Sequence, residues 1–534
     1  MTGPETVDLL ITGGTLVDGS GSAAEAGTVA CLDGRLHIGD AAWRPARAAR
    51  TLDASGMVVA PGFIDLHSHG GLVILADPRH EPKVRQGVTT EVIGVDGNGY
   101  APFDDPDDLR AFVDLNAGLD GRPPIAYDWG SVASYVGRYD RGQAVNVAVM
   151  IGNSALRIGA IGWDDVPADG PSLANMRAAL REGLEEGAFG VSSGLDYPPG
   201  AYASTDELAS LTAEAAAGGG FYHTHVRYAL GDRFLDPFRE AIEIGRRGDG
   251  PVHLTHFYHR QTHPGGPTEL LALVDDARRD GLDVTFDSYP YEWASTRLLI
   301  QLPLWVQEGG PIPLKERLAD AAVRDRLRRE LAARGAAYTG TAGWADLRLG
   351  AFTRPEHLLW ESRSLAEVMD ETGRDAVDSI CDLLLGENLG VAQVTTGPWS
   401  DTLPHFVRHP VGMVGTDSTF LGEKPSPRTY GSFPRILGQF VRDERLLSLE
   451  EAVRKMTAAP AARLGLTDRG LLRDGFWADL VIFDPARVRS NATYDQPREY
   501  PDGIEYVAVN GLLVVDGNAH TGALPGRALR RGHT

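Results

Sequence analysis

The middle of the chain alternates short apolar runs with amphipathic stretches. Runs rich in Val, Ile, Leu and Phe are each followed by longer segments with helical periodicity, such as 205–217 and 236–247. This alternation is typical of β-strand–α-helix units around a parallel sheet. Eight candidate strands with crossover helices predict an α/β fold, a (β/α)8 TIM-like barrel. The predicted strands are 63–69, 89–94, 146–152, 189–195, 221–226, 252–257, 284–290 and 411–417.

The two ends of the chain have a different pattern. Residues 1–58 and 466–534 contain short β-like runs separated by Gly and Asp turns. We expect both ends to form one small β-sandwich domain, with the barrel (59–465) inserted between them, because chain termini often lie close together. The gap between the seventh and eighth strands, about residues 297–405, is too long for a plain loop. It predicts a helical insertion that covers the mouth of the barrel.

Composition and charge narrow the class of protein. The chain has 534 residues, of which 43% are hydrophobic and 23% charged, as is ordinary for a globular protein. The net charge of −22, without a basic run, gives no reason to expect a nucleic acid or an anionic membrane as partner. No apolar stretch reaches the length of about 18 residues that spans a membrane, and residues 1–6 lack the pattern of a secretory signal.

The chain has two cysteines, Cys31 and Cys381, which stand far apart. This usage argues against a disulfide framework and favours a cytoplasmic location. The sequence leaves the oligomeric state open.

Histidines and aspartates gather at the ends of the predicted strands. His67 and His69 close the first strand, and they point to the same side because side chains alternate along a strand. Barrel active sites are built at the C-terminal strand ends, and imidazole with carboxylate ligands suits zinc or a similar divalent ion. We therefore predict a site for one or two divalent metal ions. Its candidate ligands are His67, His69, Asp96, His225, His256 and Asp417.

Two further histidines lie on the same strands. His223 shares a strand face with His225, so we expect it to line the substrate pocket. His253 faces away from His256, which predicts a packed histidine in the core.

Longer motifs point to a family. The order HxH on strand one, His on strands five and six, and Asp on strand eight resembles the amidohydrolase superfamily. Two more specific segments, SSGLDYPPG at 192–200 and PRTYGSFPR at 427–435, resemble the N-acyl-D-amino-acid deacylases, or D-aminoacylases. The resemblance extends over nearly the full chain. It implies a metal-dependent amidohydrolase that acts on carbon–nitrogen bonds other than peptide bonds and releases a D-amino acid from its N-acyl derivative.

The resemblance also implies roles for individual residues. His67, His69 and Asp417 would bind one metal ion, and His225 and His256 would bind the second. The ion would activate a water molecule and polarise the amide carbonyl of a small-molecule substrate. Asp417 would accept the proton of that water as general base and return it to the leaving nitrogen as general acid.

Asp96 departs from the family pattern at the metal site. It stands where family members often carry a cysteine that contacts the metals. A carboxylate is a harder ligand than a thiolate and can bridge two cations, so metal affinity or preference would differ. Many amidohydrolases bridge their metals with a carboxylated lysine on strand four instead, but segment 189–195 contains no lysine.

The substrate-binding residues show a second departure. Tyr197 matches a substrate-facing tyrosine, and Arg428 matches the arginine that recognises the substrate carboxylate, for which a planar guanidinium is suited. Where family members carry a His-Lys pair after the strand-six ligand, this chain has Phe257 and Tyr258. Tyr258 is therefore a further candidate for substrate contact. The pocket lacks the positive charge that the lysine of this pair would supply.

Two alternatives stay open. The same metal site would also suit the hydrolysis of a cyclic or other non-peptide amide. A catalytically inactive scaffold protein is less favoured, because such relatives usually lose metal ligands and here the set is complete.

Overall fold

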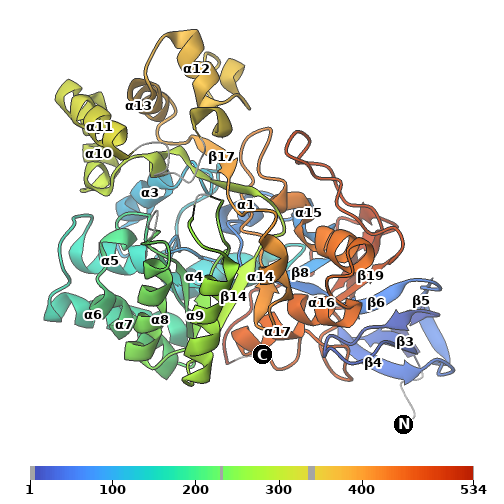
Figure 1. Ribbon diagram of the computed structural model, residues 1–534. Coiled ribbons are helices and arrows are strands. Elements are labelled where there is room, and N and C mark those ends of the chain that lie inside the picture. Colours follow the sequence, from blue (N-terminus) through green and yellow to red (C-terminus); the bar gives the residue numbers. More distant parts are fainter. Residues whose placement is uncertain (1–5, 229–232, 262, 335–342, 533–534) are drawn as a thin grey trace.

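A central parallel barrel is flanked by a β-sheet from both chain ends and by an insertion above its mouth (Figure 1). The computed structural model describes residues 6–228, 233–261, 263–334 and 343–532. Most of the N-terminal segment considered for a targeting signal, residues 1–5, lies outside the described residues. In the part of the chain that is described, no helix is both long and apolar enough to cross a membrane.

All eight expected barrel strands are present, and several end earlier than their apolar runs. They pair in parallel in chain order, and the third strand is interrupted at Met150. The strands are β7 (Phe63–Asp65), β8 (Val88–Ile93), β9 (Asn146–Val149) with β10 (Ile151–Gly152), β11 (Gly190–Gly194), β12 (Phe221–His225), β13 (Val252–Leu254), β14 (Val284–Ser288) and β18 (Gly412–Val414).

The barrel closes just beyond the ends of β7 and β18. Ser68 and Ser418 form a parallel bridge, the backbone N–H of Asp417 donates to the carbonyl of His67 (2.8 Å), and that of His69 donates to Ser418 (3.1 Å). The HxH motif and Asp417 are therefore brought together by the closure itself.

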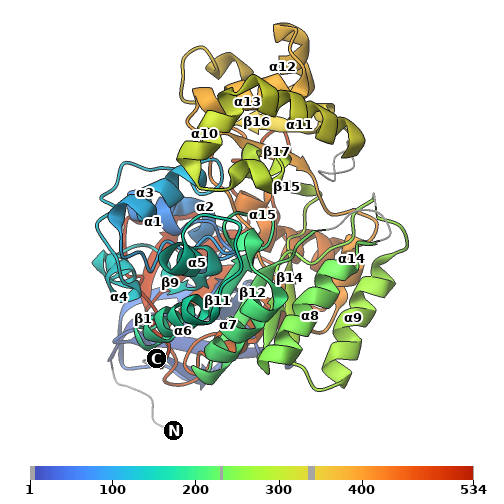
Figure 2. The ribbon, with the colours of Figure 1, turned by 90° about the vertical axis from the view of Figure 1, so that its left-hand side faces the viewer.

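Helices surround the barrel (Figure 2). Their amphipathic pattern fixes which face is buried: in α8, Phe238, Ile242 and Gly245 face the core, whereas Arg239 and Glu243 face solvent. The helices are α1 (Gly71–Ala76), α2 (Glu81–Val84), α3 (Pro106–Leu115), α4 (Val132–Val136), α5 (Asn153–Ile161), α6 (Gly170–Glu185), α7 (Thr205–Ala217), α8 (Asp236–Gly248), α9 (Pro267–Arg279), α14 (Leu403–Arg408), α15 (Arg428–Arg435), α16 (Leu449–Met456) and α17 (Ala458–Leu464).

The insertion between β14 and β18 has a core of its own, which includes Leu298, Leu314, Ile380 and Leu384. It is more than the helical cover expected from its length, because three short strands also pair antiparallel in the order β15-β17-β16. Its elements are β15 (Trp293–Arg297), α10 (Pro311–Ala319), α11 (Ala321–Arg334), β16 (Arg348–Gly350), α12 (Leu365–Thr372), α13 (Ala376–Gly386) and β17 (Ala392–Thr396).

One sheet joins the two ends of the chain. Antiparallel pairing of β6 with β19, in which Ala60 faces Val481, connects the N-terminal and C-terminal strands. The strands are β1 (Thr6–Thr12), β2 (Thr15–Leu16), β3 (Glu25–Leu32), β4 (Arg35–Asp40), β5 (Arg47–Asp53), β6 (Val58–Pro61), β19 (Leu480–Phe483), β20 (Ile504–Val509), β21 (Leu512–Asp516) and β22 (Ala519–His520).

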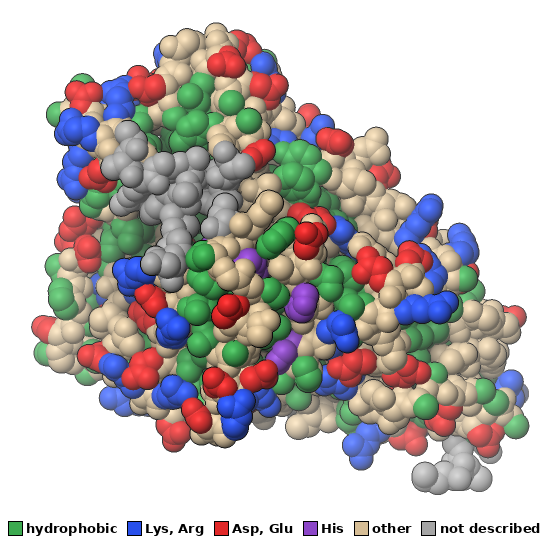
Figure 3. Space-filling view, viewed as in Figure 1, with side chains coloured by type: hydrophobic (Ala, Val, Ile, Leu, Met, Phe, Trp, Pro, Cys, Tyr) green, Lys and Arg blue, Asp and Glu red, His purple; other side chains and the backbone are tan. Residues whose placement is uncertain are grey.

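The negative charge of the protein is dispersed over the visible surface. On the face shown in Figure 3, acidic and basic side chains are interspersed. The excess of Asp and Glu over Lys and Arg, 73 against 51 residues, is therefore not gathered into one region of that face.

A buried group of charges fastens β7 to the segment after β18. Lys83 is fully buried, donates to Asp65 and donates to the hydroxyl of Thr416 (2.7 Å). The other oxygen of Asp65 accepts from the backbone N–H groups of His67 (3.1 Å) and Thr416 (2.9 Å). These bonds fix the backbone on both sides of the barrel closure.

Replacing Lys83 by Met should lower the free energy of unfolding by about 3–5 kcal/mol, because Asp65 would keep a buried charge without its partner. Chemical denaturation measures this loss. Arg79→Met is the matched control, since it removes an ion pair with Glu81 whose arginine is 53% exposed, and it should cost less than about 1 kcal/mol. Equal losses in the two variants would contradict the role given to Lys83.

Candidate metal centre

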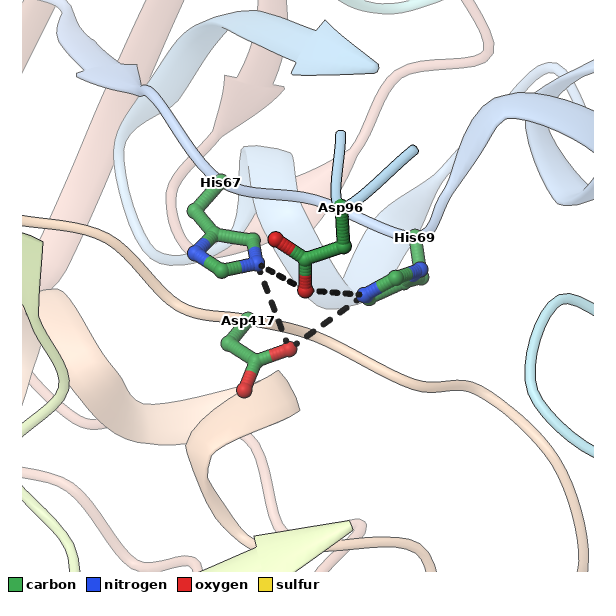
Figure 4. Close-up of side chains that lie close together, drawn as sticks. All are labelled: His67, His69, Asp96 and Asp417. Carbon is green, nitrogen blue, oxygen red and sulfur yellow. Dashed lines mark hydrogen bonds and ion pairs between the residues drawn. The ribbon is translucent and has the colours of Figure 1, made fainter. Parts of the chain in front are cut away.

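Four side chains converge at the mouth of the barrel, at the point of closure (Figure 4). His67 and His69 follow β7, Asp96 follows β8, and Asp417 follows β18. All four are at least 94% buried. The ends of three strands thus supply two imidazoles and two carboxylates to one small volume.

The spacing of these atoms fits one divalent ion. His67 Nε2 lies 3.2 Å from Asp96 Oδ2 and 3.5 Å from Asp417 Oδ1. His69 Nε2 lies 3.6 Å and 3.4 Å from the same two oxygens. A tetrahedral zinc ion with ligand bonds of about 2.0–2.1 Å separates its ligand atoms by about 3.3–3.4 Å. These four distances are therefore compatible with ligand atoms placed around one divalent ion.

A second group of possible ligands shares Asp96. The atoms His225 Nδ1 and His256 Nε2 each lie 3.7 Å from Asp96 Oδ2, and 2.9 Å from each other. The three residues form a second set able to hold a metal ion. Asp96 Oδ2 therefore stands between the two sets, where a bridging ligand would be.

Carboxylates orient the two histidines of the first set. His69 Nδ1 pairs with Asp120 Oδ1 at 2.8 Å, and the other oxygen of Asp120 accepts from the hydroxyl of Tyr100 (2.6 Å). His67 Nδ1 lies 3.4 Å from Asp287. Contacts of this kind fix the ring and leave Nε2 free for a metal ion.

The second pair of histidines is held in the same way. His225 Nε2 lies 3.0 Å from Asp196 Oδ2, which leaves Nδ1 facing Asp96. His256 Nδ1 lies 2.9 Å from the hydroxyl of Tyr228, which leaves Nε2 facing Asp96. Each ring is therefore anchored on the side opposite to Asp96.

The backbone is strained at three of the candidate ligands. Asp96, His256 and Asp417 have φ values of +53°, +34° and +47°, in the left-handed region that residues other than glycine rarely adopt. Such conformations cost about 1–3 kcal/mol each and concentrate at functional sites. The fold holds these side chains in place at the expense of stability.

Neighbouring positive charges keep Asp417 ionised. Burial raises the pKa of this carboxyl, but Arg428, whose Nη1 lies 2.8 Å from Oδ2, and His67 outweigh burial and bring the pKa below its ordinary value. Burial also raises the pKa of Asp96, but the charge of His67 and the ring nitrogens of His225 and His256, 3.7 Å away, outweigh burial and bring this pKa well below its ordinary value. Both carboxylates are thus available as ligands or bases.

A cavity of about 230 Å³ adjoins the two ligand sets. Asp96, His225, His256 and Asp417 line one part, and the insertion supplies apolar side chains, among them Ile300 and Leu302. A metal bound at the barrel mouth would therefore face a partly open cavity able to take a small molecule.

The structure brings together all six metal ligands expected from the sequence. Of the expected substrate-binding residues, Tyr197 and Tyr258 line the cavity. Arg428 is fully buried against the ring of Tyr289 (4.4 Å), and besides pairing with Asp417 it donates to the carbonyl of Ser295 (3.0 Å). Its Nη1 and Nη2 thus have partners within the protein, whereas Nε has no hydrogen-bond partner.

His223 does not line the cavity, which corrects the expectation from strand alternation. It is on the same side of β12 as His225 but two residues deeper in the barrel, where it is fully buried. Its Nε2 lies 3.2 Å from the carbonyl of Leu66, and its ring stacks on that of His253 at 5.2 Å. Whether a side chain of β12 reaches the barrel mouth therefore depends on its position along the strand as well as on the face from which it projects.

Several residues of the site were not among those expected from the sequence. Asp287 stands near the end of the seventh strand, so the strand-end rule that selected Asp417 would have found it. Asp120 and Tyr228 come from loops, where no periodic pattern marks them, and Asp196 lies in a loop within the 192–200 motif, which does not indicate its contact with His225. They were missed because only the fold brings them to the histidines.

Comparison with known proteins shows the family of this chain. A profile of the Amidohydrolase family matches residues 50–515. The chain is 36% identical to N-acyl-D-glutamate deacylase of Alcaligenes xylosoxydans xylosoxydans, over 99% of this chain and 97% of that protein. This chain belongs to the N-acyl-D-amino-acid deacylase family of amidohydrolases.

Solved structures of deacylases have the same fold. N-acyl-D-glutamate deacylase of Bordetella bronchiseptica, in complex with zinc and a phosphonate mimic of the tetrahedral intermediate, superimposes with a TM-score of 0.82. The two are 32% identical, and the match covers 98% of this chain and all of the other. A D-aminoacylase studied for its binuclear metal centre gives a TM-score of 0.81 at 31% identity, with 98% and 100% covered.

We expect Asp120→Asn to weaken metal binding about 10- to 100-fold, because the neutral amide would hold the His69 ring less firmly. Competition with a chromophoric chelator measures this affinity. Asp114→Asn is the control, since Asp114 pairs with Arg122 at the surface. A metal affinity equal to that of the control would contradict the orienting role of Asp120.

Proposed function

We propose that this protein hydrolyses N-acyl-D-amino acids to a carboxylate and a free D-amino acid in a metal-dependent reaction. The observation that carries the proposal is the pair of ligand sets that share Asp96 Oδ2 beside a partly open cavity. Membership of the deacylase family supports the substrate class.

The six expected ligands would hold one or two divalent ions. His67, His69 and Asp417 would hold one ion, zinc by analogy with the relative from Bordetella. His225 and His256 would hold a second ion, and Asp96 would bridge the two. When bound, a divalent ion makes hydroxide available near neutral pH and polarises the amide carbonyl.

Asp417 is the proposed general base and acid. Its lowered pKa keeps it ionised and ready to accept the proton of the attacking water. The same carboxyl then gives the proton to the leaving nitrogen, which departs as an amine. Arg428 restrains the second oxygen of Asp417 and so fixes the carboxylate plane.

Two tyrosines are proposed to position the substrate. Tyr197 lines the cavity, and its hydroxyl lies 2.9 Å from that of Thr296. Tyr258 lines the wall next to His256. Together with apolar side chains of the same lining, such as Leu302, these residues suit an N-acyl amino acid of small size. Because both cysteines are buried and unpaired, we propose a reducing compartment, the cytoplasm.

The test of this function is turnover of N-acetyl-D-amino acids, N-acetyl-L-amino acids and hydantoins, before and after chelation, with metal content measured in parallel. We expect release of D-amino acids that stops on chelation and returns with zinc. Hydrolysis of hydantoins alone would move the substrate to cyclic amides. A protein that binds no metal and hydrolyses none of the panel would contradict the proposal.

Asp417→Asn should reduce kcat about 10²- to 10⁴-fold, the usual contribution of a general acid–base group. Far-ultraviolet circular dichroism should be unchanged, and the metal content should be measured because Asp417 is also a candidate ligand. Near-native kcat in a variant that still contains metal would assign the proton transfer to another residue.

A further inference from the structure

Arg260 reaches the cavity from the loop after β13. It follows His256 by four residues and lines the cavity together with Tyr228 and Tyr258. Its Nη2 donates to the hydroxyl of Tyr258 (3.0 Å). The guanidinium carbon lies 5.1 Å from the ring centroid of Tyr228 and 5.3 Å from that of Tyr258. The two aromatic rings therefore hold the cation at the cavity wall.

Arg260 differs from the other arginines of the site in its partners. Within the described residues, no carboxylate lies within 4.0 Å of its guanidinium. Arg227, which also lines the cavity, pairs with Glu240 and donates to two backbone carbonyls. Arg428 pairs with Asp417 and keeps an unbonded Nε, but it is not among the residues that line the cavity. Arg260 is thus the cavity-lining arginine, in the described part of the chain, with donors left for a ligand.

Two neighbouring polar groups also lack partners. The hydroxyl of Tyr289 and Nδ1 of His263 are buried without a hydrogen bond, and both residues line the cavity. Burial and the charge of Arg260 lower the pKa of His263 to about 3, so its ring adds no charge. Buried polar groups usually have partners, so this wall is built for a polar ligand.

We propose that Arg260 binds the carboxylate of the substrate and so determines the preference for anionic N-acyl amino acids. This inference rests on the proposed function. Family members carry a lysine at the position of Tyr258. In this chain Arg260 supplies a positive charge close to that position, because its guanidinium donates to the Tyr258 hydroxyl. The planar fork of arginine can bind both oxygens of a carboxylate at once.

The carboxylate could be the α-carboxylate or that of an acidic side chain, and three substrates separate the two sources. N-acetyl-D-leucine carries the α-carboxylate alone, N-acetyl-D-glutamate carries both, and N-acetyl-D-leucinamide carries neither. The variants are Arg260→Gln, which removes the charge, and Arg260→Lys, which keeps it. Arg239→Gln is the control, since Arg239 is exposed on α8, pairs with Asp236 and lies outside this cavity.

Arg260→Gln should raise KM about 10- to 100-fold for a carboxylate substrate, which corresponds to the loss of a charged hydrogen-bonded pair. The KM for the leucinamide and the kcat for all three substrates should change little. In Arg260→Lys, the KM for the carboxylate substrates should rise less than in Arg260→Gln. An effect on both acids assigns the α-carboxylate, whereas an effect on the glutamate alone assigns the side chain. Unchanged KM for both acids, or an equal rise for the leucinamide, would overturn the proposal.

Calorimetric binding of N-acetyl-D-leucine and N-acetyl-D-glutamate separates this inference from the proposed function. If the wild type hydrolyses no N-acyl-D-amino acid, the proposed function fails. Binding that is weakened in Arg260→Gln and retained in Arg239→Gln would still support the carboxylate site. Binding that is absent in the wild type, or equal in Arg260→Gln, would contradict it.

Discussion

The parallel contact between the ends of β7 and β18 is the constraint on which the site depends. The bonds from Asp417 N–H to the carbonyl of His67 and from His69 N–H to Ser418 close the barrel and bring the ligands together. Asp65 and Lys83 stabilise the same junction, because Lys83 donates to Asp65 and Asp65 accepts from the backbone N–H of His67. The interaction that completes the fold therefore also assembles the metal centre.

The charges at this junction explain why a cation belongs there. Asp96 and Asp417 stay ionised although both are buried, and isolated buried charges are costly. Without a metal ion, the charges of His67 and Arg428 offset them. A bound divalent ion would offset the charges of the two carboxylates at shorter range, with Asp96 between the two ligand sets. The carboxylate at position 96 thus gives the centre an all-nitrogen and oxygen ligand set.

The sequence predicts the barrel and the ligands well because both depend on local pattern. Apolar runs mark the eight strands, and the strand-end rule selects residues such as Asp96 and His225. The pairing of β15 with β17 could not be predicted, because the partners are separated by roughly a hundred residues. The alignment of Arg428 with Asp417 and the placement of Arg260 on two tyrosines likewise depend on tertiary contacts.

The most direct test of the metal centre is the X-ray absorption spectrum of the zinc-loaded protein at the zinc edge. We expect nitrogen and oxygen scatterers at about 2.0–2.1 Å and no sulfur, because Asp96 takes the bridging place and both cysteines are buried outside the site. A sulfur scatterer at about 2.3 Å, or zinc that does not bind, would contradict it.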